Sequence, residues 1–492
     1  MNQENIQTTS TERRSASWDI KNAPKNYFSL VLTQFGSAFF AFATVWLISK
    51  KIGSEGYGGV VAIIAASQVA QILVNWTSYS VVRFGTEEFV ETEKIARVFW
   101  LRFFVLVPNL LLVLLASRFW FPPLADWLKL PVESFWYVIA HFVTTALWIH
   151  IQISLQSVKL PRMQGFLMMI ERVIILAGIG ILAAIGKLSP LNALICYPVA
   201  AILVVLAGIF FLRKYLFAPF SVDLKFIKKI LAYSLPLLPF SLVGYFSGSY
   251  VDAIFVSKFL STKDLGIYSV ASQINGMALQ LPTLANSLLI PFFVTLQKEN
   301  LTQKLNAYFE TLLPVLTLMW GLFCTFLAIG GYFLIPLIFG NEFYQSVMPF
   351  MILLAASVVG LPGLCGYSGL THSYSLTYFV TISSILSAFV NVILNYLLIP
   401  DYGMAGCAWA TFFSYFVSTA TSAVLLNAKV EMPVSWIFLS VLPIFSGAVI
   451  YFFTKNIWFS LGVNFTLFCL IALLKKRSLI SSFDVLKGFM RN

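Results

Sequence analysis

Apolar stretches of roughly twenty residues follow one another along almost the whole chain, separated only by short polar segments. A helix needs about 20 predominantly apolar residues to cross the hydrocarbon core of a bilayer. The sequence therefore predicts an all-α polytopic membrane protein with about 14 transmembrane helices. The predicted spans are Tyr27–Ser49, Tyr57–Val82, Phe99–Ala116, Phe135–Val158, Gly165–Ile185, Leu191–Leu212, Ile230–Val256, Gly266–Leu296, Tyr308–Leu334, Val347–Leu370, Leu376–Ile399, Met404–Leu426, Trp436–Phe453 and Trp458–Leu474.

The composition excludes an ordinary soluble domain. Hydrophobic residues make up 59% of the 492 residues and charged residues only 11%, whereas soluble domains carry roughly 25% charged residues. The five cysteines lie singly inside apolar stretches, without a CxxC pair or a histidine at metal-ligand spacing. We interpret them as small buried hydrophobes, and we expect no metal site and no cofactor other than a coupled proton or sodium ion.

The distribution of basic residues predicts the orientation of the chain. With the N-terminus inside, 24 of the 32 Lys and Arg residues fall on the cytoplasmic side and 8 on the outer side. This bias follows the positive-inside rule and predicts that both termini lie in the cytoplasm. The expected location is the bacterial inner membrane. The bias also accounts for the net charge of +12 through topology and anionic lipid, so no nucleic-acid partner is expected.

The spans divide into two groups of six and a terminal pair. A repeat supports this division, because Lys51–Gly58 resembles Phe259–Gly266 at an offset of 208 residues, which joins equivalent helices of parallel repeats. Two mixed polar and apolar stretches, Arg83–Val98 and Tyr215–Lys229, suit amphipathic helices on the cytoplasmic face. The expected parts are a cytoplasmic tail (1–26), an N-lobe (27–214), a linker (215–229), a C-lobe (230–428), a terminal helix pair (434–474) and a C-terminal tail (475–492).

Arginines within or beside the spans are candidates for a substrate site. Arg172 lies about two turns into its predicted helix, where an ionisable group calls for an aqueous cavity or a partner. The structural alternative is an ion pair with Glu171 or with a neighbouring helix. Arg83 and Arg102 sit at cytoplasmic helix ends, where they either snorkel to the surface or help to capture a pyrophosphate, whose oxygens suit the guanidinium fork.

The seventh predicted span carries a polar stripe. Tyr245, Gly248, Ser249 and Asp252 recur at spacings of three and four residues, which places them on one helix face. Asp252 is the only carboxylate of this span. It either binds sugar or couples an ion, or it is a structural group that forms a salt bridge with Lys258 or lies at the membrane interface.

Polar amides extend this pattern to other spans. Asn391 and Asn395 share one face of the eleventh predicted span, where asparagine either joins helices or binds sugar hydroxyls. Gln34 in the first span is a further candidate sugar contact.

Several segments together resemble the polysaccharide (O-antigen type) flippase family of the multidrug/oligosaccharidyl-lipid/polysaccharide (MOP) exporter superfamily, and the resemblance covers essentially the whole chain. The segments are Ile52–Gly58, Tyr233–Pro239 with Val251 and Asp252, Leu265–Ala271, Phe343 and Tyr344 before Pro349 and Phe350, and Asn391–Gly403 continuing to Thr411.

This resemblance implies two six-helix lobes in a V around a central cavity, two extra C-terminal helices, and alternating access. The implied cargo is an undecaprenyl-diphosphate-linked oligosaccharide repeat unit that moves from cytoplasm to periplasm for surface polysaccharide such as the O-antigen of lipopolysaccharide. The resemblance also implies a cationic cavity, and Arg172 is the first candidate to line it, followed by Arg83 and Arg102. The implied partners of a monomeric flippase are membrane lipids, a polysaccharide polymerase and chain-length machinery.

Other functions remain open at this point. An ion-coupled drug or metabolite exporter of the same superfamily would use a buried carboxylate in the first or seventh span, and Asp252 keeps that alternative open. A lipid II flippase would share the same chemistry. A membrane glycan polymerase or glycosyltransferase needs acid/base groups near one another, whereas His141, His150 and His372 are isolated. The sequence therefore predicts a transporter and not an enzyme.

Overall fold

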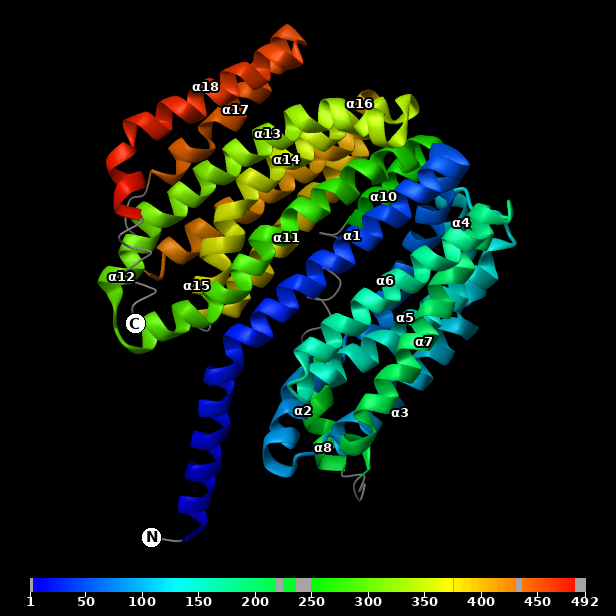
Figure 1. Cartoon of the computed structure of the whole chain (residues 1–492), viewed down its shortest axis with the longest axis vertical. Coiled ribbons are helices and arrows are strands. Elements are labelled where there is room, and N and C mark those ends of the chain that lie inside the picture. The colour runs from blue at the N-terminus through cyan, green and yellow to red at the C-terminus, as the bar shows by residue number, and fades with distance from the viewer. Residues whose placement is uncertain (1–2, 218–223, 236–248, 375, 431–435, 483–492) are drawn as a thin grey trace. The chain divides into compact units, whose positions relative to one another are not determined.

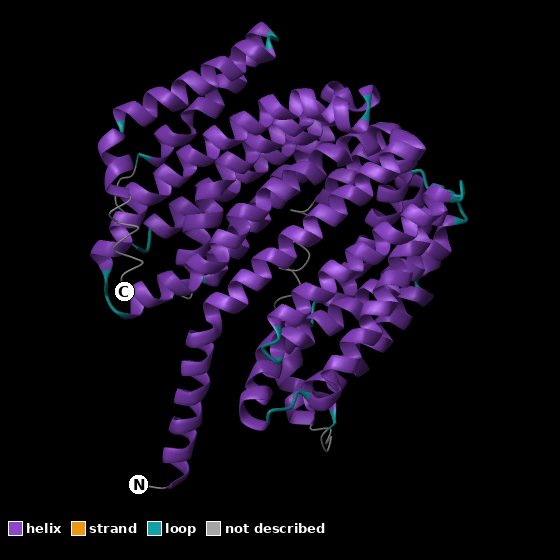
Figure 2. Cartoon of the chain, viewed as in Figure 1, coloured by secondary structure: helices purple, strands orange, loops and turns teal. Residues whose placement is uncertain are grey.

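The computed structural model describes residues 3–217, 224–235, 249–374, 376–430 and 436–482. Throughout these ranges all regular secondary structure is helical (Figure 2). The predicted all-α class is thereby confirmed. Tyr245 and Gly248 of the predicted polar stripe lie outside the described residues.

The chain runs through a succession of helices (Figure 1). In the first half these are α1 (Gln3–Asn75), α2 (Ser78–Thr92), α3 (Ala96–Leu115), α4 (Ser117–Leu128), α5 (Ser134–Ser157), α6 (Pro161–Ala184), α7 (Pro190–Leu216) and α8 (Leu224–Ser234). The second half contains α10 (Ser249–Phe259), α11 (Thr262–Lys298), α12 (Thr302–Ala307), α13 (Leu313–Phe339), α14 (Val347–Pro362), α15 (Ser368–Ser373), α16 (Thr377–Asn427), α17 (Ile437–Thr454) and α18 (Ile457–Leu474).

Nine helical segments among the described residues are long and apolar enough to cross a membrane. Two of them, Val31–Asn75 with 45 residues and Tyr378–Asn427 with 50 residues, each overlap two predicted spans. The fold is thus a multi-pass membrane protein. The grouping of fourteen spans into six, six and two stays a prediction.

Glycine breaks both of these long segments. Gly53 has φ 71° and ψ −177° inside α1, and Gly403 has φ 57° and ψ −140° inside α16, conformations that a residue with a Cβ rarely adopts. After the first break, the helix start at Ser54 is capped from far along the chain. Its backbone N–H and its hydroxyl both donate to the Glu342 carboxylate at 3.2 Å.

The chain divides into two compact units. Unit 1 comprises Met1–Leu47, Ala70–Arg118 and Trp136–Leu238, and unit 2 comprises Ile48–Val69, Phe119–Phe135 and Pro239–Asn492. In unit 1 an apolar core joins α3, α5, α6 and α7 through buried residues that include Phe99, Trp148, Leu167 and Val204. This core fixes the two helices that carry Trp148 and Arg172.

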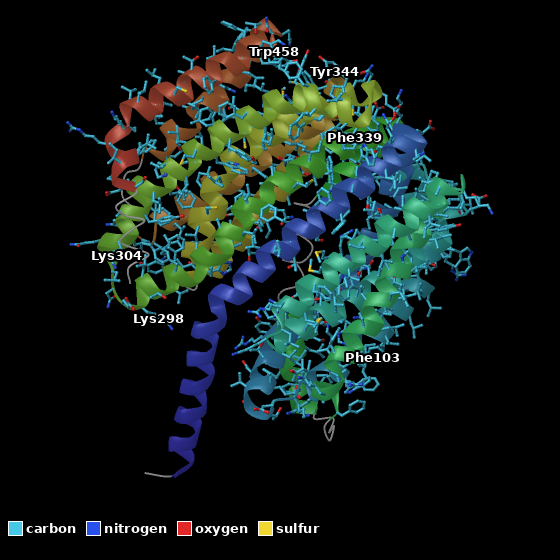
Figure 3. All side chains as sticks on the ribbon, viewed as in Figure 1. Phe103, Lys298, Lys304, Phe339, Tyr344 and Trp458 are labelled. Carbon is cyan, nitrogen blue, oxygen red and sulfur yellow. The ribbon has the colours of Figure 1, made fainter. Side chains whose placement is uncertain are left out.

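Unit 2 is centred on α11, α13, α14 and α16, with α17 and α18 packed side by side (Figure 1). Within this unit Lys298 and Lys304 lie at one end, and Phe339, Tyr344 and Trp458 lie at the other (Figure 3). The charge-based topology assigns the lysine end to the cytoplasm. The aromatic end fits the interfacial belt of a membrane protein.

The two copies of the predicted repeat meet within unit 2. A Cβ added to Gly58 would collide with the backbone oxygen of Thr262, and a Cβ added to Gly266 would collide with the backbone oxygen of Ser54. Both pairs of equivalent residues are 208 positions apart. The contact is therefore reciprocal, and it brings two helix backbones together in the manner of small-residue crossings in membranes.

The two predicted amphipathic stretches overlap α2 and α8, which pack against each other. Phe84 of α2 contacts Phe226 and Tyr233 of α8 with ring centroids 6.1 and 5.5 Å apart. The Glu88 carboxylate accepts hydrogen bonds from the backbone N–H groups of Arg97 and Val98 at 2.9 Å each. This carboxylate caps the start of α3 and ties α2 to it.

Candidate functional site

Arg172 lies on α6, a 24-residue helix that meets the length and composition of a membrane span. Its side chain is half-buried. Across the described ranges, no hydrogen bond or salt bridge joins Arg172 to an acidic side chain. The neighbouring Glu171 instead accepts a hydrogen bond from the indole N–H of Trp148 on α5 at 2.9 Å. The guanidinium of Arg172 interacts electrostatically with both Glu171 and His141.

Arg83 lies on the exposed surface of α2. Its side chain is 54% exposed and its Nε donates to Glu87 at 3.5 Å. The guanidinium also lies over the ring of Tyr233, 4.8 Å from the centroid. Water screens this kind of exposed pair, so Arg83 stays accessible to a second anion.

Arg102 occupies a different environment, although the sequence placed it at a helix end like Arg83. It is only 3% exposed, and its donors reach Thr77 Oγ1 at 3.3 Å, Ser78 Oγ at 3.0 Å and His150 Nδ1 at 2.7 Å. Because Arg102 can only donate, His150 accepts through Nδ1 and carries its proton on Nε2. Arg102, which belongs to α3, thereby connects the junction between α1 and α2 to α5 through hydrogen bonds.

Asp252 of α10 lies at the centre of a polar cluster inside unit 2, and its side chain is 5% exposed. Tyr268 of α11 donates to Oδ2 at 2.7 Å, and Thr411 of α16 donates to the same oxygen at 3.0 Å. Asn395 of α16 donates to Oδ1 at 3.2 Å. We call these four residues, together with Asn391, the Asp252 cluster.

The two asparagines belong to this cluster as a pair. Asn395 Nδ2 also donates to Asn391 Oδ1 at 3.0 Å, and both side chains are buried, at 0% and 5% exposure. Asn395 thus joins α16 to α10, as the helix-joining alternative predicts. Its own Oδ1 is buried and has no hydrogen-bond partner among the described residues.

The expected salt bridge partner of Asp252 lies elsewhere. The Lys258 ammonium lies over the ring of Trp127, 3.7 Å from its centroid, and also approaches Phe259 and Tyr396. No ion pair between Asp252 and Lys258 is found in the described part of unit 2. Among the described residues, the hydrogen-bond donors to this carboxylate are therefore all neutral.

This arrangement suits a single positive charge. One carboxylate and several neutral oxygens can take up a proton or a monovalent cation, whereas a divalent ion usually requires more negative charge. No group of three His, Cys, Asp or Glu side chains with metal-ligand geometry occurs in the described ranges.

Sequence reasoning missed two members of the cluster, Tyr268 and Thr411. Both stand in segments that carry the family resemblance, but their polar groups are isolated within apolar helices and gave no signal of their own. The remaining candidate, Gln34, is half-buried on α1, and its Oε1 has no hydrogen-bond partner in the described part of the chain.

Comparison with known proteins gives one family and several related structures. The family described as "Polysaccharide biosynthesis protein" matches residues 23–297, which is more than half of the chain. No curated protein matches by sequence.

Solved structures show the fold. A structure described as the lipid II flippase MurJ in an inward closed conformation is similar over 92% of this chain and 99% of that one, with 16% identity and a TM-score of 0.67. A structure of the MATE multidrug transporter DinF-BH is similar over 83% of this chain and 95% of that one, with 14% identity and a TM-score of 0.54. A structure described as an inward-facing MATE transporter of the MOP superfamily is similar over 81% of this chain and 96% of that one, with 14% identity and a TM-score of 0.54.

The helices therefore adopt a fold shared with transporters of the MOP superfamily. The sequence match extends over the N-terminal segment, α6 with Arg172, and α10 with Asp252. This multi-pass membrane protein belongs to the polysaccharide biosynthesis protein family, as the sequence resemblance predicted.

Proposed function

We propose that the protein is a flippase that carries an undecaprenyl-diphosphate-linked oligosaccharide repeat unit from the cytoplasmic to the outer leaflet by alternating access. Family membership supports a role in polysaccharide biosynthesis, and the fold likeness to a lipid II flippase and to MATE transporters supports transport. The cargo combines a lipid tail, which stays in the bilayer, with a diphosphate and sugars that must avoid the hydrocarbon.

One observation carries the proposal: the charge of Arg172 lies within a membrane helix, and in the described residues no salt bridge joins it to an acidic side chain. Such a charge is costly in an apolar surrounding, and a diphosphate that binds the guanidinium fork would offset that cost. We propose Arg83 as the surface arginine that first attracts the diphosphate. Arg102, with its donors turned inward, would act on the site by holding the α1–α2 junction. Gln34, Tyr245 and Asn391 remain proposed sugar contacts.

Arg172→Ala tests this role. We expect the variant to reach the membrane at the normal level and to fail to restore surface polysaccharide in a strain deleted for the gene. Arg213→Ala is the matched control, because Arg213 is an exposed arginine at the end of α7 that contacts the ring of Phe210. Full restoration by Arg172→Ala would remove Arg172 from the substrate site.

The Asp252 cluster favours ion coupling, which would also suit a drug or metabolite exporter. We propose that a proton or sodium ion binds at Asp252 and drives transport of the lipid-linked glycan. Asp252→Asn should make transport insensitive to the coupling gradient. Normal gradient dependence in this variant would exclude Asp252 from coupling. Efflux of cationic dyes by the wild type, with no effect of the gene on surface glycan, would favour the exporter instead.

A further inference from the structure

Glu171 and Arg172 are consecutive residues of opposite charge in an apolar helix. Neighbouring positions on an α-helix point about 100° apart, but both side chains are long enough to turn toward each other. Attraction between opposite charges is far stronger in a low-dielectric surrounding than in water. An unconstrained Glu171 would therefore compete with any anionic ligand for the guanidinium.

Trp148 competes with Arg172 for the Glu171 carboxylate, which still interacts electrostatically with Arg172. Its indole N–H donates to Glu171 Oε2 at 2.9 Å and draws the carboxylate toward α5. The indole is 3% exposed and packs in the apolar core of unit 1 with residues such as Ile151 and Leu155. A donor held this firmly orients the carboxylate more strictly than water could.

The same face of α5 presents a second ring to this pair. His141 precedes Trp148 by seven residues, which places both rings on one face of the helix. His141 is buried at 7% exposure and interacts electrostatically with Arg172. Helix α5 thus presents an indole to Glu171 and an imidazole to Arg172, and it offers no carboxylate to the arginine.

We propose that Trp148 is a positioning residue, which holds Glu171 away from Arg172 and so keeps the guanidinium free for the diphosphate of the lipid-linked cargo. This inference rests on the proposed function. It makes Glu171 a potential competitor of the substrate and not a structural ion-pair partner of Arg172. Once the indole N–H is removed, the released carboxylate becomes an internal competitor of the substrate.

Trp148→Phe, Glu171→Gln and the double variant test the proposal, with undecaprenyl diphosphate as the probe in a binding titration of the purified protein. Trp148→Phe keeps an aromatic ring in the core but removes the donor. We expect it to weaken binding roughly tenfold, since loss of a hydrogen bond to a charged group is worth at least about this factor. Glu171→Gln alone should bind like the wild type, and the double variant should bind within about twofold of the wild type.

Glu171→Asp provides a second route if Trp148→Phe does not fold. It keeps the charge but shortens the side chain by one methylene, which breaks the bond to the indole, so we expect weaker binding than for Glu171→Gln. Trp136→Phe is the matched control on α5, because Trp136 is 73% exposed, and it should leave binding unchanged.

Three results separate the possibilities. Unchanged binding by Trp148→Phe, or a double variant as weak as Trp148→Phe alone, overturns the positioning role and leaves Trp148 as a packing residue. Unchanged binding by Arg172→Ala overturns the proposed substrate site itself. Weak binding by Arg172→Ala together with normal binding by Trp148→Phe and by Glu171→Asp rejects only the inference made here about Trp148.

Discussion

The crossing of Gly58 and Gly266 allows a quantitative test of the fold. Gly58→Ala places a methyl group against the backbone oxygen of Thr262, and a backbone atom cannot move aside without shifting a whole helix. Overpacking of this kind costs about 1–3 kcal/mol or more. Alanine recovers about 1 kcal/mol through its higher helix propensity. The net expectation is destabilisation of about 0–2 kcal/mol, and of more where the helices cannot separate.

The same calculation applies to Gly266, because its Cβ would meet the oxygen of Ser54. Gly276 on the same helix α11 is the matched control, since no atom lies within 4 Å of its added Cβ. Gly276→Ala should gain up to about 1 kcal/mol. Thermal unfolding of the purified proteins, followed by the loss of monomer after heating, ranks the variants. If Gly58→Ala and Gly276→Ala melt alike, the reciprocal crossing is not where the structure has it.

Three further changes test local contacts. Tyr268→Phe removes the hydroxyl that donates to Asp252, and the free energy of unfolding should fall by about 1.5–3 kcal/mol; an unchanged denaturation midpoint would contradict the bond. Glu342→Ala removes the cap at Ser54, with an expected loss of about 0.5–2 kcal/mol, whereas Glu342→Gln keeps one acceptor and should melt closer to the wild type. Burial raises the pKa of Glu88 above its ordinary value, against the two backbone N–H groups that lower it. The folded protein then holds a proton that the unfolded chain has lost, so stability falls as the pH rises from the ordinary carboxyl range through the raised pKa. Glu88→Gln should abolish this part of the pH dependence of melting, and a persisting slope would assign it to another group.

The membrane helices were predictable because the bilayer imposes their length. The predicted span Gly165–Ile185, for example, agrees with α6 (Pro161–Ala184) within a few residues. The direct succession of two helices with a break only at Gly53 was not predictable, since a glycine in a polar segment favours a loop. The distant Glu342 caps the helix that starts at Ser54, and the local sequence contains no sign of this contact.

The candidate site was likewise predictable only in part. Asp252 and Asn395 were each recognised as polar groups inside apolar helices, where such groups are costly. Their contact joins residues 143 positions apart, and periodicity within one helix contains no information about such a distance. Arg102 is the opposite case. Its place near a helix end suggested a surface position, but the turn at Thr77 and Ser78 packs over it.

The Asp252 cluster has an electrical consequence. With the carboxylate ionised, the cluster carries one negative charge among neutral side chains, and one proton or monovalent cation makes it neutral. Moving one elementary charge through a membrane potential of 100 mV changes its energy by about 2.3 kcal/mol. A conformational change that carries the ionised cluster across part of this field would therefore be voltage-dependent, whereas the same change with the cluster neutralised would be electrically silent. The membrane potential, and not only the ion gradient, would then affect the rate at which the protein returns to the conformation that binds substrate.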